Sequence, residues 1–189
     1  MSESGRAVRA TRVVVFETHA TSLDNEAGLA SGWFDVGLSP RGEQQARELG
    51  ERRRRDAFAA VYCSDLTRAA RTAELAFGER GIPIVRDVRL RECDYGALTR
   101  DPSSEVEARR VDHITTPFLD GESYEDATRR VGQWLAEAAR TYAGGRIIVI
   151  GHRATFYALE HLINGIPLRD VITAPWQWQP GWSYTLSRE

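Results

Sequence analysis

Short apolar runs alternate along the chain with longer segments in which apolar positions recur every three or four residues. The short runs are rich in β-branched residues and predict buried strands; they lie at 11–16, 59–64, 146–152 and 182–186, with a shorter extended piece inside 81–93. The longer segments predict amphipathic helices; they lie at about 40–55, 65–77, 121–145 and 154–164. Because strands and helices alternate, the sequence predicts an α/β fold.

That order of elements predicts a three-layer sandwich, with a mostly parallel central sheet and helices on both faces. We expect a single domain over residues 11–189, preceded by a flexible N-terminus at 1–10. Residues 94–120 have no strong periodicity, and we interpret them as a lid-like, partly helical excursion over one face. This segment and the loop at 22–36 should form the rim of a pocket.

Polar residues mark where the predicted helices begin and end. Ser39 and Ser123 are expected to be N-caps, and Ser64 with Asp65 should cap the helix at 65–77. The arginine run at 52–55 falls at a helix C-terminus, where cations are favourable. We interpret that run as a solvated helix end.

Composition narrows the class of protein. The chain has 189 residues, of which 42% are hydrophobic and 28% charged, and its net charge is −2. No apolar run approaches the ~20 residues of a membrane helix, and no leader sequence is evident. We therefore expect a cytoplasmic protein that binds a small molecule rather than nucleic acid or a membrane, and a homodimer is left open. Cys63 and Cys93 fit no disulfide or metal spacing, which indicates buried, reduced thiols.

Candidate chemistry gathers where the predicted strands end. His19 follows the first strand, Ser64 and Arg68 follow the second, and His152 follows the strand at 146–152; Glu92 comes after a fourth extended piece. Because ligands bind at the carboxyl ends of parallel strands, these groups should converge. Two histidines and a carboxylate could hold a metal ion, but the nearby arginines would repel it, so we predict a metal-free, electropositive pocket for a phosphoryl group.

Six motifs occur in order over most of the chain: THATSLDN, GWFDVGLSPRGEQQARELG, YCSDLTRAARTA, LRECDYG, GESYED and IIVIGHRA. In this order the sequence resembles the histidine phosphatase superfamily, in the branch of the cofactor-dependent phosphoglycerate mutases and small phosphatases. The resemblance implies a phosphoglycerate mutase-like fold without a bound cofactor. It also implies that His19 is a nucleophile that becomes phosphohistidine, that Arg68 and His152 bind phosphate, and that Glu92 donates a proton.

The sequence departs from this family at the first motif and after the second histidine. Thr18 stands where the family has an arginine, Thr21 where it has a glutamate, and Arg153 where it has a glycine. Our hypothesis is that Arg153 places its guanidinium in the space beside Thr18; the alternative is that Glu17 pairs with Arg153 and holds it away from phosphate. The predicted substrate-binding residues are Arg153, Thr18, Thr21, Asn25 and Trp33, with Trp176 as a further candidate at the pocket mouth.

The sequence predicts a metal-independent phosphomonoesterase that hydrolyses a small soluble phosphate ester through a phosphohistidine at His19. Splitting the reaction into two steps lowers each barrier. Two alternatives stay open: a weakened phosphate-ligand binder, and an enzyme that uses the same pocket for a different biosynthetic reaction. A mutase is less expected, because no long insertion follows LRECDYG. Glu107, Glu122 and Asp94 are alternatives to Glu92 as proton donor.

Overall fold

The computed structural model describes residues 12–142 and 145–186, so the N-terminus predicted to be flexible, at 1–10, lies outside the described residues. The strands are β1 (Arg12–Thr18), β2 (Ala60–Cys63), β3 (Ile84–Arg86), β4 (Arg146–Gly151) and β5 (Trp182–Leu186). The α-helices are α1 (Leu23–Ala27), α2 (Pro40–Arg52), α3 (Thr67–Phe77), α4 (Ser103–Arg109), α5 (Tyr124–Thr141), α6 (Arg153–Asn164) and α7 (Leu168–Thr173). Short 3-10 turns lie at Gly78–Arg80, Val88–Leu90 and Gly96–Leu98.

The five strands form one mixed sheet in the order β3-β2-β4-β1-β5. β1, β2, β3 and β4 run parallel, and only β5 is antiparallel, paired with β1. The central strand β4 and its neighbour β1 are buried on both faces, which explains why their sequences are continuous apolar runs rather than alternating ones. The predicted, mostly parallel sheet is confirmed.

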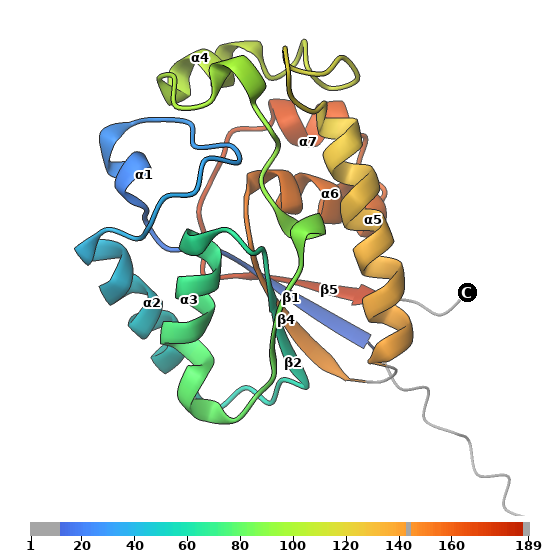
Figure 1. Cartoon of the computed structure of the whole chain (residues 1–189). Helices are drawn as coiled ribbons and strands as arrows, with labels where there is room; N and C mark the ends of the chain where they lie inside the picture. Colours follow the sequence, from blue (N-terminus) through green and yellow to red (C-terminus); the bar gives the residue numbers. More distant parts are fainter. Residues whose placement is uncertain (1–11, 143–144, 187–189) are drawn as a thin grey trace, which may run out of the picture.

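Helices cover both faces of this sheet (Figure 1). Because successive strand residues point to opposite faces, Val14 and Phe16 pack with α5 and α6, whereas Val15 packs with α2 and α3. Trp134 from α5 and Phe77 from α3 are among the largest fully buried side chains of the two layers. The predicted three-layer sandwich is therefore confirmed.

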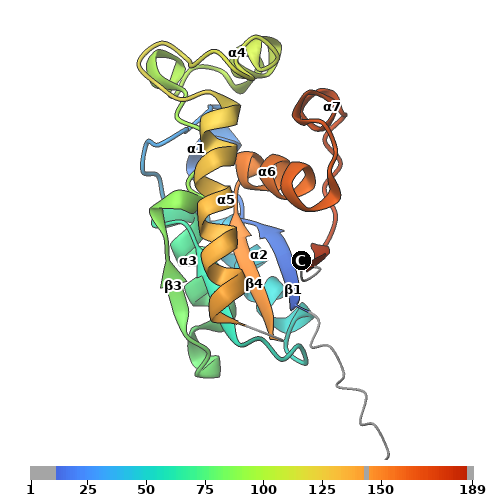
Figure 2. The same cartoon turned by 90° about the vertical axis from the view of Figure 1, so that its right-hand side faces the viewer.

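A third apolar cluster lies beyond the end of the sheet, where α4 stands apart from the other helices (Figure 2). It joins Ala30 of the first long loop, Val106 of α4 and Phe118 to Tyr157 of α6 and Ile172 of α7. The segment at 94–120 therefore does pack over one end of the molecule. Its action as a lid stays a prediction.

Helix starts and ends agree with the sequence in part. Ser39 and Ser123 cap α2 and α5 as predicted, and Ser123 forms the full capping box. The prediction for α3 was wrong: its N-cap has no side-chain hydrogen bond, and the Asp35 carboxylate instead accepts from the backbone N–H and hydroxyl of Thr67. A carboxylate brought from 32 positions away does the same electrostatic work as a local cap.

The interpretation of the arginine run at 52–55 as a solvated helix end is right for Arg54 and Arg55, which are exposed, but not for Arg53. Arg53 has only 15% of its side chain exposed, and it bonds through two nitrogens to the Glu17 carboxylate, at 2.9 and 2.7 Å. Arg52 bonds to the other oxygen of Glu17, at 3.0 Å. A buried carboxylate must be paired, so Arg52 and Arg53 tie the end of α2 to Glu17 of β1.

None of the helices in the described ranges is long and apolar enough to cross a membrane. Both cysteines are buried and free, as predicted.

Candidate active site

The carboxyl ends of β1, β2 and β4 meet at one edge of the sheet and carry His19, Ser64 and His152. The imidazole rings of His19 and His152 lie 4.9 Å apart, centroid to centroid. This convergence across more than a hundred positions was predicted, and it follows from the parallel pairing of β1 with β4, in which Thr18 is level with Gly151.

His19 is held in one orientation by the backbone. The backbone N–H of His19 donates to the Gly151 carbonyl oxygen at 2.9 Å, and this bond extends the β1–β4 ladder by one residue. Its Nδ1 lies 2.7 Å from the Ala20 carbonyl oxygen. A carbonyl oxygen only accepts, so Nδ1 carries the proton and Nε2 keeps a free lone pair. Burial, followed by the charge of Arg68, lowers the pKa of His19 from 6.5 to about 3, so the ring is neutral.

His152 is the N-cap of α6 and is almost completely buried. Its Nε2 lies 2.7 Å from the Ser64 hydroxyl, whereas its Nδ1 is buried with no hydrogen-bond partner. Burial is the main cause that lowers the pKa of this ring well below its usual value, and the charges of Arg68 and His19 add to it.

Arg68 lies in the first turn of α3 and is buried. Its guanidinium donates to the carbonyl oxygens of Gly32, at 2.8 Å, and Phe34, at 3.1 Å. Within the described part of the chain, these partners are neutral, and no carboxylate forms an ion pair with Arg68. A buried cation near a helix N-terminus is electrostatically unfavourable unless an anion binds there.

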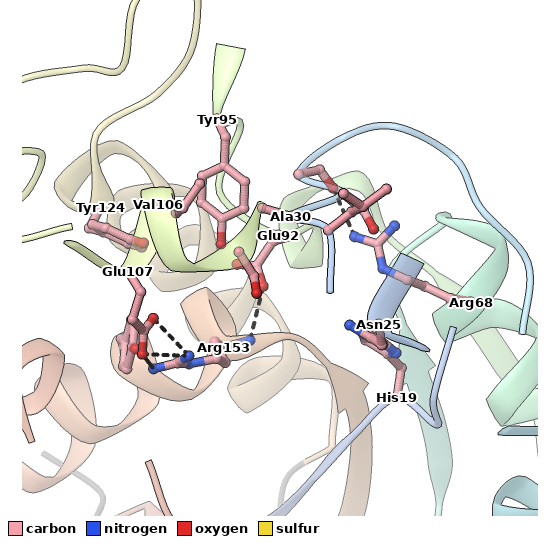
Figure 3. Close-up of a pocket in the computed structure, with 15 residues that line it drawn as sticks. His19, Asn25, Ala30, Arg68, Glu92, Tyr95, Val106, Glu107, Tyr124 and Arg153 are labelled. Carbon is pink, nitrogen blue, oxygen red and sulfur yellow. Dashed lines mark hydrogen bonds and ion pairs between the residues drawn. The ribbon is translucent and has the colours of Figure 1, made fainter. Parts of the chain in front are cut away.

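Glu92 is buried, and its carboxylate lies at the start of α6. Its carboxylate accepts hydrogen bonds from the backbone N–H groups of Cys93, Arg153 and Ala154, at 2.9, 3.2 and 3.0 Å. The last two are the first N–H groups of α6, which have no partner inside the helix. Glu92 therefore occupies the positive end of this helix and lines the same cavity as His19 (Figure 3).

Arg130 of α5 was missed by the sequence reasoning. Its guanidinium bonds to the backbone carbonyl oxygens of Arg89, Arg91 and Glu92, each at 2.8 Å, and also to the Glu122 carboxylate. It thus fixes the backbone that carries Glu92. The available signal was an arginine beside Val131, on the buried face of a helix where a charge needs several partners.

Arg153 does not follow either of the two hypotheses drawn from the sequence. Its guanidinium bonds to the Glu107 carboxylate, at 3.1 to 3.3 Å, and lies over the rings of Tyr157 and Trp176. Figure 3 shows the side chain pointing toward Glu107 and away from His19. Glu17 pairs with Arg52 and Arg53 instead. The hypotheses missed Glu107 because it lies on α4, whose position the sequence did not give.

The other predicted substrate-binding residues divide into two groups. Thr18, Thr21 and Asn25 line the cavity around His19, and Thr21 bonds through its N–H and hydroxyl to the side-chain oxygen of Gln45. Trp33 is outside the lining of this cavity: its indole N–H donates to the Glu92 carbonyl oxygen at 2.7 Å. Trp33 therefore holds the backbone of Glu92 instead of contacting the cavity.

Two cavities meet at His19 and share His19, Asn25, Glu92 and Arg153 in their linings. The smaller, about 150 Å³, extends under α4 and contains Arg68. The larger, about 640 Å³, extends the other way, along α2. Among the residues that the structure describes, no three histidine, cysteine, aspartate or glutamate side chains gather as a metal ion would require.

The sequence model of one family, the histidine phosphatase superfamily (branch 1), matches residues 14–180. The chain belongs to this superfamily. Relatives in it include a 2,3-bisphosphoglycerate-dependent phosphoglycerate mutase of Methylobacterium radiotolerans, 34% identical over 82% of this chain and 80% of that protein. The uncharacterized phosphatase PhoE of Bacillus subtilis is 33% identical over 71% of this chain and 68% of its own length.

The fold of the superfamily is also evident among solved structures. YhfR of Bacillus stearothermophilus superposes with a TM-score of 0.78 and 25% identity, covering 91% of this chain and 90% of that one. The phosphoglycerate mutase-like fold predicted from the motifs is therefore confirmed. The roles of the individual site residues stay predictions, supported by the geometry above.

Proposed function

We propose that this protein is a metal-independent phosphomonoesterase that forms a phosphohistidine at His19. The observation that carries the proposal is the neutral His19 ring, whose Nδ1 proton is fixed by Ala20 and whose Nε2 lone pair is free. A neutral imidazole beside a buried guanidinium is a nucleophile placed next to an anion site. Membership of the superfamily supports the same chemistry.

The reaction follows from these positions. His19 Nε2 attacks phosphorus, the bond from phosphorus to the ester oxygen breaks, and the departing alkoxide takes a proton from the Glu92 carboxyl group. Water then attacks the phosphohistidine, returns a proton to Glu92 and releases inorganic phosphate with His19 restored. Arg68 and the His152 ring, which lie beside His19, would stabilise the charge on the phosphoryl oxygens through both steps.

Glu92 is favoured over the other carboxylates as the proton donor. It is the glutamate that lines both cavities at His19. Glu107 is paired with Arg153 and Arg110, and Glu122 is paired with Arg130. Glu107 lines only the smaller cavity, and Glu122 and Asp94 line neither, so Glu92 is the best placed of the four.

Hydrolysis is favoured over mutase activity, although the names of the relatives include both. A mutase that passes a phosphoryl group between two positions has to bind two phosphoryl groups at once. Two of the arginines that line the cavities, Arg52 and Arg153, are already paired with Glu17 and Glu107. Among the described residues, Arg41 is then the remaining arginine without an ion pair in the lining of the larger cavity, so a second phosphoryl group would meet one cation there.

The test is turnover of p-nitrophenyl phosphate in the presence of a chelator, by the wild type and by His19→Ala. We expect the variant to lose at least about 100-fold in kcat, because it lacks the nucleophile. A rapid acid-free quench with radiolabelled substrate should show phosphate on the wild-type chain and none on the variant. Equal turnover by both proteins would refute the proposal, and retained phosphate binding without turnover would favour a binding protein.

A further inference from the structure

The larger cavity can account for the identity of the substrate, because the proposed reaction involves only the part of it near His19. The small cavity, about 150 Å³, contains Arg68 and is roomy enough for a phosphoryl group. Pockets that enclose an organic ligand are commonly ~300–1,000 Å³. The larger cavity, about 640 Å³, falls in that range, so the alcohol part of a substrate fits there.

One wall of the larger cavity is a single face of α2. Its lining residues there are spaced at three or four positions, as one helix face requires: Arg41, Gln45, Glu48, Leu49 and Arg52. The floor is formed by the short side chains of Thr18, Ala20 and Thr21. This wall offers three charged side chains, one amide and a small apolar surface, but no aromatic ring.

The aromatic part of the lining comes from the segment between α7 and β5. Trp176 is fixed by Phe156 and Trp182, at ring distances of 5.2 and 5.6 Å, and by the Arg153 guanidinium over its face. Trp178 also lines the cavity and has 61% of its surface exposed. Trp178 therefore presents exposed apolar surface to the cavity. A flat ring bound in the cavity would pack against its indole.

From these walls we infer that the larger cavity takes the alcohol part of the substrate and selects phosphate monoesters whose alcohol carries a flat ring, which packs against Trp178 and Trp176. This inference rests on the proposed function for the position of the phosphoryl group. A short, linear polyol would leave both indoles wet and would fill a small part of the cavity.

The experiment compares 1-naphthyl phosphate with glycerol 3-phosphate as substrates for the wild type, Trp178→Ala and Trp178→Phe. We expect Trp178→Ala to lower the ratio of the two kcat/KM values about three- to tenfold, the usual size of one lost aromatic contact, and Trp178→Phe to restore most of it. Leu119→Ala is the matched control, since Leu119 is 73% exposed and lines neither cavity, and it should leave the ratio unchanged. An unchanged ratio in Trp178→Ala overturns the inference.

A binding measurement separates this inference from the proposed reaction. The non-hydrolysable 1-naphthylmethylphosphonate should bind the His19→Ala protein by calorimetry, and Trp178→Ala in that background should weaken binding about three- to tenfold. If this loss is seen while no ester is hydrolysed by the wild type, the ring site stands and the phosphatase proposal fails. If esters are hydrolysed but Trp178→Ala leaves phosphonate binding unchanged, the ring site fails and the phosphatase proposal stands.

Discussion

At the scale of single residues, the candidate site combines two neutral imidazole rings with one buried cation. His19 and His152 are neutral because they are buried next to Arg68, and among the described residues Arg68 bonds to carbonyl oxygens rather than to a carboxylate. The histidines and Arg68 could be predicted, because each follows the end of an apolar strand. The partner of Arg153 could not, since Glu107 is reached only after the chain has folded over the sheet edge.

Thr18 gives a direct test of the missing charge in the first motif. Thr18 lines the cavity beside His19, so Thr18→Arg would add a guanidinium to the phosphoryl site. A charge-assisted hydrogen bond contributes about 1.5–3 kcal/mol, so kcat/KM for p-nitrophenyl phosphate should rise roughly 10- to 100-fold. Thr18→Gln, of similar length but uncharged, is the control. Equal effects of the two variants would show that charge at this position does not reach the substrate.

At the scale of elements, α2 fixes the position of the segment that carries His19. Gly42, in the first turn of α2, lies so close to the loop that a Cβ there would overlap the Thr21 carbonyl oxygen. Ser39 also bonds back to Thr21 through its backbone N–H, at 3.0 Å. The end of α2 is tied to β1 by the Glu17 pairs. Both ends of the helix therefore brace the segment that carries His19.

Gly42→Ala should consequently destabilise the protein and lower its activity, against the usual trend. An alanine in a helix interior is ordinarily ~1 kcal/mol more favourable than glycine, but here the backbone of Thr21 would have to move. Gly132→Ala in α5 is the control, because its Cβ would make an ordinary contact with Leu162 and should stabilise. Urea unfolding and kcat measure both effects; a stabilised, fully active Gly42→Ala would contradict the bracing role.

Elements differ in how well the sequence foretells them. The long helices and the buried strands were predicted because a period of about 3.6 residues, or a β-branched run, is visible over their length. The helices α1 and α7, with 5 and 6 residues, were missed, since so short a helix shows barely one turn of pattern. The cap of α3 was missed for another reason: Asp35 is distant in sequence and acts only through the fold.

At the scale of the whole molecule, the neutral histidines couple stability to pH. In the unfolded chain His19 titrates near 6.5, whereas in the folded protein its pKa is about 3. Between these values the unfolded state binds a proton that the folded state does not, so the free energy of unfolding falls as the pH falls below 6.5. The lowered pKa of His152 acts in the same direction.

We expect the free energy of unfolding to drop by about 1–2 kcal/mol between pH 7 and pH 5 through His19 alone. This range allows for solvent screening of the His19 ring, which is partly exposed. Urea titrations at the two pH values would measure this loss in the wild type and in His19→Ala. The variant should lose less stability on acidification, by about that amount. Equal losses in the two proteins would mean that His19 is not held neutral.

The guanidinium of Arg68, which bonds to carbonyl oxygens and to no carboxylate among the described residues, has a consequence for the proposed reaction. It is a buried positive charge in the lining of the smaller cavity. A tetrahedral oxyanion bound beside it would offset that charge, whether it arrives as reactant or is left behind as product. Where inorganic phosphate is plentiful, the protein would rest in a product-loaded form, and each new cycle would begin by exchanging one anion for another.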